Sequence, residues 1–103
     1  GNVVIDRPPD DAMQAALAAW AKAATVGGNQ AWVQLSHAGR QTMKKVNPHP
    51  HAPSAVKLGL PGGQFGEPVM MEEKEVGDVV RRFATAAAAI RQASGGPRRS
   101  RTT

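Results

Sequence analysis

The sequence contains no cysteine and no tyrosine, and its 103 residues include only two tryptophans and two phenylalanines. The missing cysteine excludes a disulfide framework, a thiol nucleophile and a thiolate metal site. No apolar run approaches the roughly 20 residues of a membrane-spanning helix, and the N-terminus lacks the basic flank of a signal peptide. These absences predict a soluble, cytoplasmic chain that makes no membrane contact and has a thin core.

Positive charge is concentrated at the C-terminal end. Arg98, Arg99 and Arg101 account for three of the five net positive charges. The remainder of the chain therefore has an ordinary charge balance, and nucleic-acid binding is not expected of it. Residues 94–103 offer almost no apolar side chain to bury, so we expect them to form a disordered basic tail.

The first third of the chain predicts a strand, a helix and a second strand. Residues 2–6 form a β-branched run, and residues 31–37 form another apolar run that ends in polar side chains. Between them, Asp10 is a suitable N-cap, and Gly27 and Gly28 are suitable helix terminators. The apolar positions at helical spacing, which we expect to face the core, are Met13, Leu17, Trp20 and Ala24.

Residues 38–70 contain five prolines and five glycines, a composition that predicts a long loop without regular structure. From Glu72 to about Ala93 the pattern is helical again. Its expected buried stripe is Val76, Val79, Val80, Phe83, Ala87 and Ile90. Alternating strands and helices favour a parallel α/β sheet or barrel, but two strands complete neither. The pattern is that of a β-α-β-loop-α slice of a larger fold.

Residues 32–41, Trp-Val-Gln-Leu-Ser-His-Ala-Gly-Arg-Gln, resemble the third strand and following loop of the old yellow enzyme family of flavin-dependent oxidoreductases. Residues 1–6 resemble that family's second strand, and residues 20–24 resemble its second helix. Segments 53–55 and 79–84 recur in the family's order. The resemblance extends to about residue 93. At position 71 the family often has a capping Thr or Ser, and this chain has Met71.

Members of this family are (β/α)8 barrels that bind FMN, take hydride from NAD(P)H and pass it to small activated alkenes. The resemblance implies that residues 1–93 are a partial barrel, with strands two and three and helices two and three. A full barrel has about 250 residues. The substrate-anchoring pair after the fourth strand, the phosphate loops and the tyrosine proton donor have no counterpart here. We therefore expect a truncated chain that has no catalytic residue and is inactive alone.

The resemblance assigns a cofactor contact to Gln34. By analogy with the family, its side-chain amide hydrogen-bonds the pyrimidine edge of FMN, whose alternating donors and acceptors an amide can match. The alternative is a strand-end glutamine that bonds only a loop. His37 and Arg40 are assigned supporting positions behind the flavin contact, although a histidine beside a glycine turn often only pins its loop.

No other motif predicts a site. His49 and His51 flank a proline on an exposed loop, and no third metal ligand is evident nearby, so no metal is predicted. The glycine-rich segment 59–66 lacks the spacing of a dinucleotide fingerprint. Glu72, Glu73 and Glu75 suit the first turn of a helix. The alternative function is a noncatalytic remnant or interaction module that contacts acidic partners through its basic tail. A strand-bearing fragment of this kind is also expected to self-associate.

Overall fold

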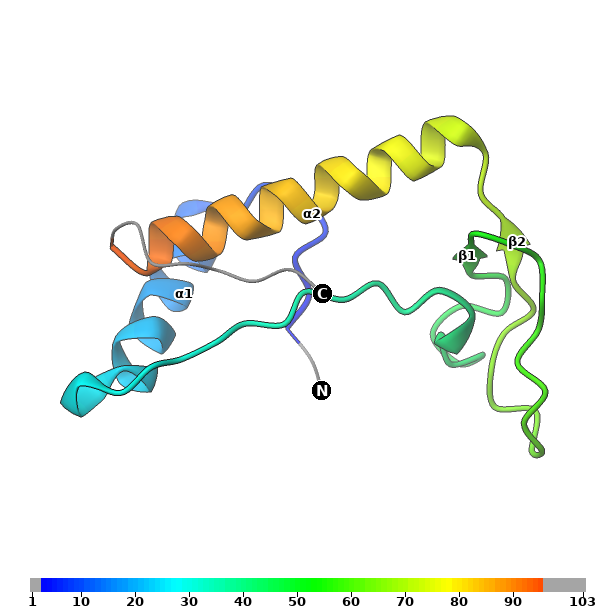
Figure 1. The fold of residues 1–103 in the computed structure, drawn as a ribbon, viewed down its shortest axis with the longest axis horizontal. Helices are drawn as coiled ribbons and strands as arrows, with labels where there is room; N and C mark the ends of the chain where they lie inside the picture. Colours follow the sequence, from blue (N-terminus) through cyan, green and yellow to red (C-terminus); the bar gives the residue numbers. More distant parts are fainter. Residues whose placement is uncertain (1–2, 96–103) are drawn as a thin grey trace. The chain divides into compact units, whose positions relative to one another are not determined.

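The computed structural model describes residues 3–95. In chain order it contains α1 (Asp11–Ala24), η1 (Val26–Gly28), η2 (Gly39–Gln41), β1 (His51–Ala52), β2 (Val69–Met70) and α2 (Glu73–Ala93) (Figure 1). The described chain divides into two compact units. The first contains residues 3–35 and 80–95, and the second contains residues 36–79. The basic tail predicted at 94–103 lies, from residue 96 on, outside the described residues.

Helix α1 begins where the sequence predicts. The Asp10 carboxylate accepts a hydrogen bond of 2.8 Å from the backbone N–H of Met13, as an N-cap does. The helix is capped by Thr25, and Gly27 follows with a positive φ of 79°. The expected buried face is only partly correct, because Leu17 is 4% exposed whereas Trp20 is 53% exposed. Trp20 is therefore a surface residue.

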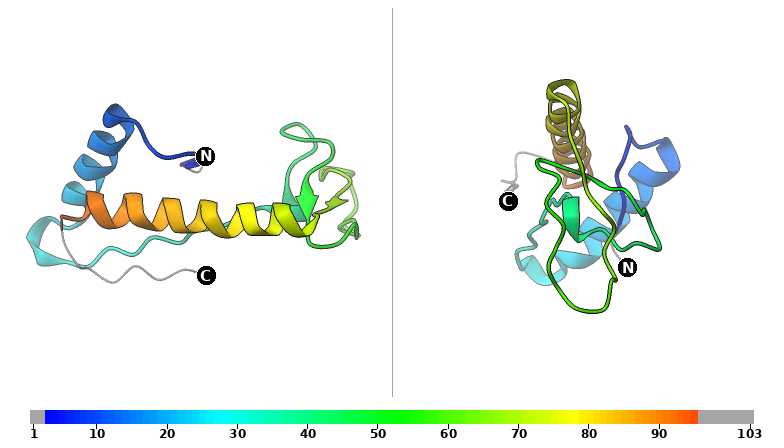
Figure 2. Two further views of the ribbon diagram at one scale, coloured as in Figure 1. Left: turned by 90° about the horizontal axis from the view of Figure 1, so that it is seen from above. Right: turned by 90° about the vertical axis from the view of Figure 1, so that its right-hand side faces the viewer.

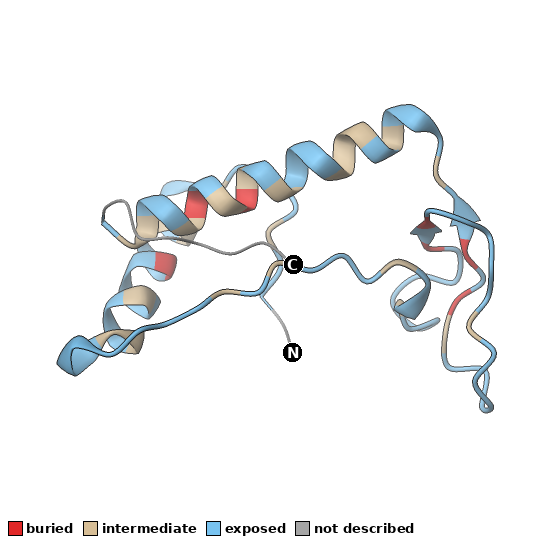
Figure 3. Cartoon of the chain, viewed as in Figure 1, coloured by how far each residue is buried: buried red, intermediate tan, exposed pale blue. Residues whose placement is uncertain are grey.

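Helix α2 is a single uninterrupted helix (Figure 2), and its predicted bounds are confirmed to within a residue. In the first unit its buried side chains are Ala86 and Ala89 (Figure 3). Gln14 of α1 donates a hydrogen bond of 2.9 Å to the backbone oxygen of Ala89, which joins the two helices. The predicted stripe is wrong at Val76 and Val80, which are both exposed. The small alanines and Leu17 are thus what this unit buries.

The second unit contains a two-stranded parallel sheet inside the segment predicted to have no regular structure. His51 pairs with Val69, and Ala52 pairs with Met70. The ladder extends past the assigned strands, with backbone N–H to O distances of 2.8, 2.8 and 2.9 Å for Glu67 to Pro48, Val69 to Pro50 and Met71 to Ala52. Proline cannot donate a backbone hydrogen bond, but here the prolines only accept. The prediction that residues 38–70 have no regular structure is therefore wrong.

Gly66 lies in the tightest part of this unit. A Cβ atom at this position would be 2.5 Å from the backbone oxygen of Asn47, 2.8 Å from that of Pro48 and 2.7 Å from the ring of Pro50. Its N–H donates to the backbone oxygen of Thr42 at 3.0 Å. Only glycine lets the two chain segments approach this closely.

The predicted fold class is also wrong. Neither residues 3–6 nor residues 31–37 form a strand in the described part of the chain, so no β-α-β-loop-α barrel fragment is present. The physical reason is that a parallel strand needs a hydrogen-bonded neighbour and cover on both faces. Val3 and Val4 are instead exposed, and neither segment belongs to a sheet. Apolar β-branched composition alone does not make a strand without that neighbour.

Candidate functional site

Gln34 lies in the first unit, in an extended segment after η1. Its side chain is exposed and has no hydrogen-bond partner among residues 3–95. Both the donor and the acceptor of the amide are therefore available to a ligand. The alternative role of Gln34 requires a hydrogen bond to a loop of the same chain, and no such bond is present within residues 3–95.

His37 and Arg40 belong to the second unit and flank the turn at Gly39. The His37 Nδ1 accepts a hydrogen bond of 3.2 Å from the backbone N–H of Gly39, so this nitrogen carries no proton. Gly39 has a positive φ of 53°, which favours glycine. His37 therefore holds the turn, as the simpler interpretation of a histidine beside a glycine predicts. Its supporting role behind a flavin remains a prediction.

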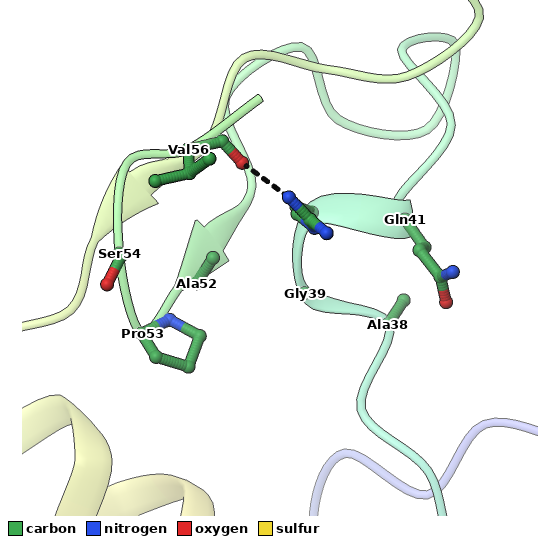
Figure 4. Close-up of a pocket in the computed structure, with 8 residues that line it drawn as sticks. Ala38, Gly39, Gln41, Ala52, Pro53, Ser54 and Val56 are labelled. Atoms are coloured by element: carbon green, nitrogen blue, oxygen red, sulfur yellow. Dashed lines mark hydrogen bonds between the residues drawn. The ribbon is translucent and has the colours of Figure 1, made fainter. Parts of the chain in front are cut away.

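Arg40 lines a pocket of about 390 Å³ in the second unit (Figure 4). Its guanidinium Nη1 donates a long hydrogen bond of 3.5 Å to the backbone oxygen of Val56. Gln41 and Ser54 lie on opposite sides of the pocket in Figure 4. The remaining lining residues are small or apolar: Ala38, Gly39, Ala52, Pro53 and Val56. The lining thus combines one cationic group and two neutral polar side chains with small and apolar ones.

The lining of this pocket includes no histidine and no carboxylate, so the Ser54 hydroxyl has no general base among these residues. The polar side chains that the lining offers to a bound ligand are Arg40, Gln41 and Ser54.

The groups whose pKa values are shifted, Asp6 and Arg7, belong to the first unit and do not line this pocket. The Arg7 guanidinium donates two hydrogen bonds, of 3.0 and 3.1 Å, to the Asp6 carboxylate. This contact lowers the pKa of Asp6 and raises that of Arg7 from their ordinary values. The two residues are neighbours in sequence, and both side chains are exposed. Their contact marks a surface ion pair and not an active site.

A second polar contact joins β1 to α2. The His51 Nε2 lies 3.1 Å from the Glu75 Oε2. The sequence did not predict this pair, because His51 lies within the long loop and Glu75 in the helix after it, and their approach depends on how that loop folds. Within residues 3–95 no cluster of three or more histidine or acidic side chains is placed to share a metal ion.

No helix in the described part of the chain is long and apolar enough to cross a membrane. No protein-family model matches the chain, and no curated protein matches it closely enough to count as a relative. The resemblance of residues 32–41 to the old yellow enzyme family accordingly remains a prediction made on the residues themselves.

Proposed function

We propose that this chain contributes the pyrimidine-edge contact to FMN in a cytoplasmic NAD(P)H oxidoreductase of the old yellow enzyme type. The observation that carries the proposal is the ten-residue motif at 32–41 together with the exposed Gln34 amide, which bonds no other described residue. A flavin pyrimidine ring presents N–H and C=O groups side by side, and a primary amide offers a matching donor and acceptor. The reductant is NAD(P)H, and the substrate is a small activated alkene.

The chain alone is inactive under this proposal. The substrate-anchoring pair and the tyrosine proton donor of such enzymes have no counterpart here, and the lining of the Arg40 pocket supplies no acid or base. Purified chain should give no steady NADPH-dependent reduction of an enone. Turnover by the chain alone would contradict this assignment of roles.

The test of the flavin contact is a titration of FMN. In the purified chain, Gln34→Ala should weaken FMN binding or shift the flavin reduction potential. Loss of a buried hydrogen bond that leaves a flavin group unpaired costs about 1–3 kcal/mol. Gln30→Ala is the matched control, because Gln30 is an exposed glutamine in the same segment. Unchanged affinity and potential for Gln34→Ala would refute the contact.

The alternative is a noncatalytic interaction module. The observation that favours it is the exposure of large apolar side chains in both units, including Trp20 and Val46. Its basic arginines, Arg98, Arg99 and Arg101, lie outside the described residues. Nucleic-acid binding that weakens steeply with salt and is lost when residues 96–103 are removed would support this alternative. Yellow colour in the purified protein would support the flavin proposal.

A further inference from the structure

The His51–Glu75 pair contains an unusual oxygen atom. The Glu75 Oε2 is shielded from solvent, yet it accepts no hydrogen bond from any residue of the described chain. The His51 Nε2 is 3.1 Å away, but the ring is not oriented to donate to it. A shielded carboxylate oxygen without a donor is costly, and such an atom in a native structure commonly marks the place of an ion or a water molecule.

Both side chains come from backbone that is held in place. His51 lies in β1, where the flanking carbonyls of Pro50 and Ala52 accept hydrogen bonds from the β2 segment at 2.8 and 2.9 Å. Glu75 lies in the first turn of α2, and its N–H donates to the backbone oxygen of Glu72 at 3.0 Å. His51 and Glu75 belong to the same compact unit. The backbone positions of both residues are therefore held by hydrogen bonds within one compact unit.

The separation suits a metal ion. Zinc binds imidazole nitrogen and carboxylate oxygen at about 2.0–2.2 Å, so two such ligands on a tetrahedral ion lie roughly 3.4 Å apart. The observed 3.1 Å needs an adjustment of only a few tenths of an ångström. The His51 side chain is 57% exposed, which leaves a route from solvent. The neighbouring cation Lys74 does not compete, because its ammonium pairs with Glu72 at 3.7 Å.

We propose that the His51 Nε2 and the Glu75 Oε2 bind one divalent cation of the zinc class, with water in the remaining coordination positions. Nitrogen and oxygen donors without thiolate suit zinc and similar borderline cations. Since only two protein ligands are present, the ion exchanges with solvent. The site is independent of the proposed flavin contact.

The test is a titration of the metal-free 103-residue chain with zinc chloride, followed by equilibrium dialysis. One equivalent should bind saturably. His51→Gln and Glu75→Gln should each weaken binding about tenfold or more, since loss even of an outer partner of a metal site costs 10–100-fold. His49→Gln and Glu73→Gln are matched controls that alter an exposed histidine and an exposed glutamate close by. These controls should retain the affinity of the original chain.

A second measurement covers the case in which Glu75→Gln disturbs folding. In the unsubstituted chain, zinc should shift the ring proton resonances of His51 before those of His37 and His49. Absence of saturable binding would overturn the proposal. So would binding that His49→Gln abolishes and Glu75→Gln leaves intact, because that result would assign the ion to a surface pair of histidines.

Discussion

The close approach at Gly66 shows how one residue sets the packing of the second unit. Two backbone oxygens and a proline ring lie within 2.8 Å of the place where a Cβ would be. Real Cβ atoms do not approach backbone oxygens so closely, and backbone cannot move aside as a flexible side chain can. The hydrogen-bonded ladder from Pro48 to Ala52 lies directly beside this contact, so any displacement is transmitted to the strands.

Gly66→Ala should therefore destabilise the sheet. Forcing a methyl group into such a contact costs about 1–3 kcal/mol. The expected result is faster hydrogen exchange at the backbone amides of Val69 and Met71, which donate across the ladder. Gly59→Ala is the control, because no atom lies within 4 Å of its added methyl group. Equal exchange rates in Gly66→Ala and Gly59→Ala would show that the segment around Gly66 accommodates the added methyl group.

At the scale of the elements, the two helices show how little apolar surface the first unit buries. Helix α1 buries Leu17, and α2 buries Ala86 and Ala89. Helix formation in isolation is marginal at 14 residues, so α1 depends on these contacts and on its cap. The largest side chain of α1, Trp20, lies mostly in solvent. Among the side chains of α1, Leu17 therefore stabilises the first unit more than Trp20 does.

This distribution predicts effects of different size for two truncations on α1. Leu17→Ala should lower the free energy of unfolding by about 2 kcal/mol, the lower end of the range for buried leucines, because so small a core can collapse around the gap. Trp20→Ala should change it by about 0.5 kcal/mol or less, as surface substitutions do. Urea unfolding followed by far-UV circular dichroism measures both. If Trp20→Ala lowered the free energy of unfolding by clearly more than about 0.5 kcal/mol, the tryptophan would be buried in solution.

At the scale of the whole molecule, exposed apolar side chains outnumber the buried ones among the described residues. The buried apolar side chains are Leu17, Pro50, Ala52, Pro68, Ala86 and Ala89. Large apolar side chains are exposed in both units, valine and tryptophan in the first and valine, leucine and methionine in the second. The two-stranded sheet has open edges on both sides within the described chain. Surfaces and edges of this kind associate with other chains unless they are covered.

We therefore expect the purified chain to self-associate. Its weight-average mass in sedimentation equilibrium should rise with concentration, and sulfate should strengthen the association because apolar contacts drive it. Val69→Lys combined with Met70→Lys should reduce it, since charges on an edge strand oppose pairing. Lys45→Ala, which removes an exposed charge near the sheet, should not reduce it. A chain that stays monomeric at all concentrations and melts cooperatively would contradict the expectation.

Both helices follow from local sequence, because their hydrogen bonds, caps and glycine terminators are local. Asp10 needs only Met13 three residues away, and the bounds of α2 follow from its periodicity and the glycines that succeed it. The sequence also predicts that Gln34 binds a flavin, and this role stays a prediction.

The sheet and the buried positions depend on the three-dimensional fold, because strand pairing and burial join residues that lie far apart in sequence. The β-branched run at residues 3–5 pairs with nothing in the described sheet, whereas a proline-rich segment does pair, through the carbonyls of Pro48 and Pro50. The same folding of the long loop brings His51 to Glu75. A residue's type gives it a preference for extended backbone. Whether that backbone pairs in a sheet depends on which distant segment the fold places next to it.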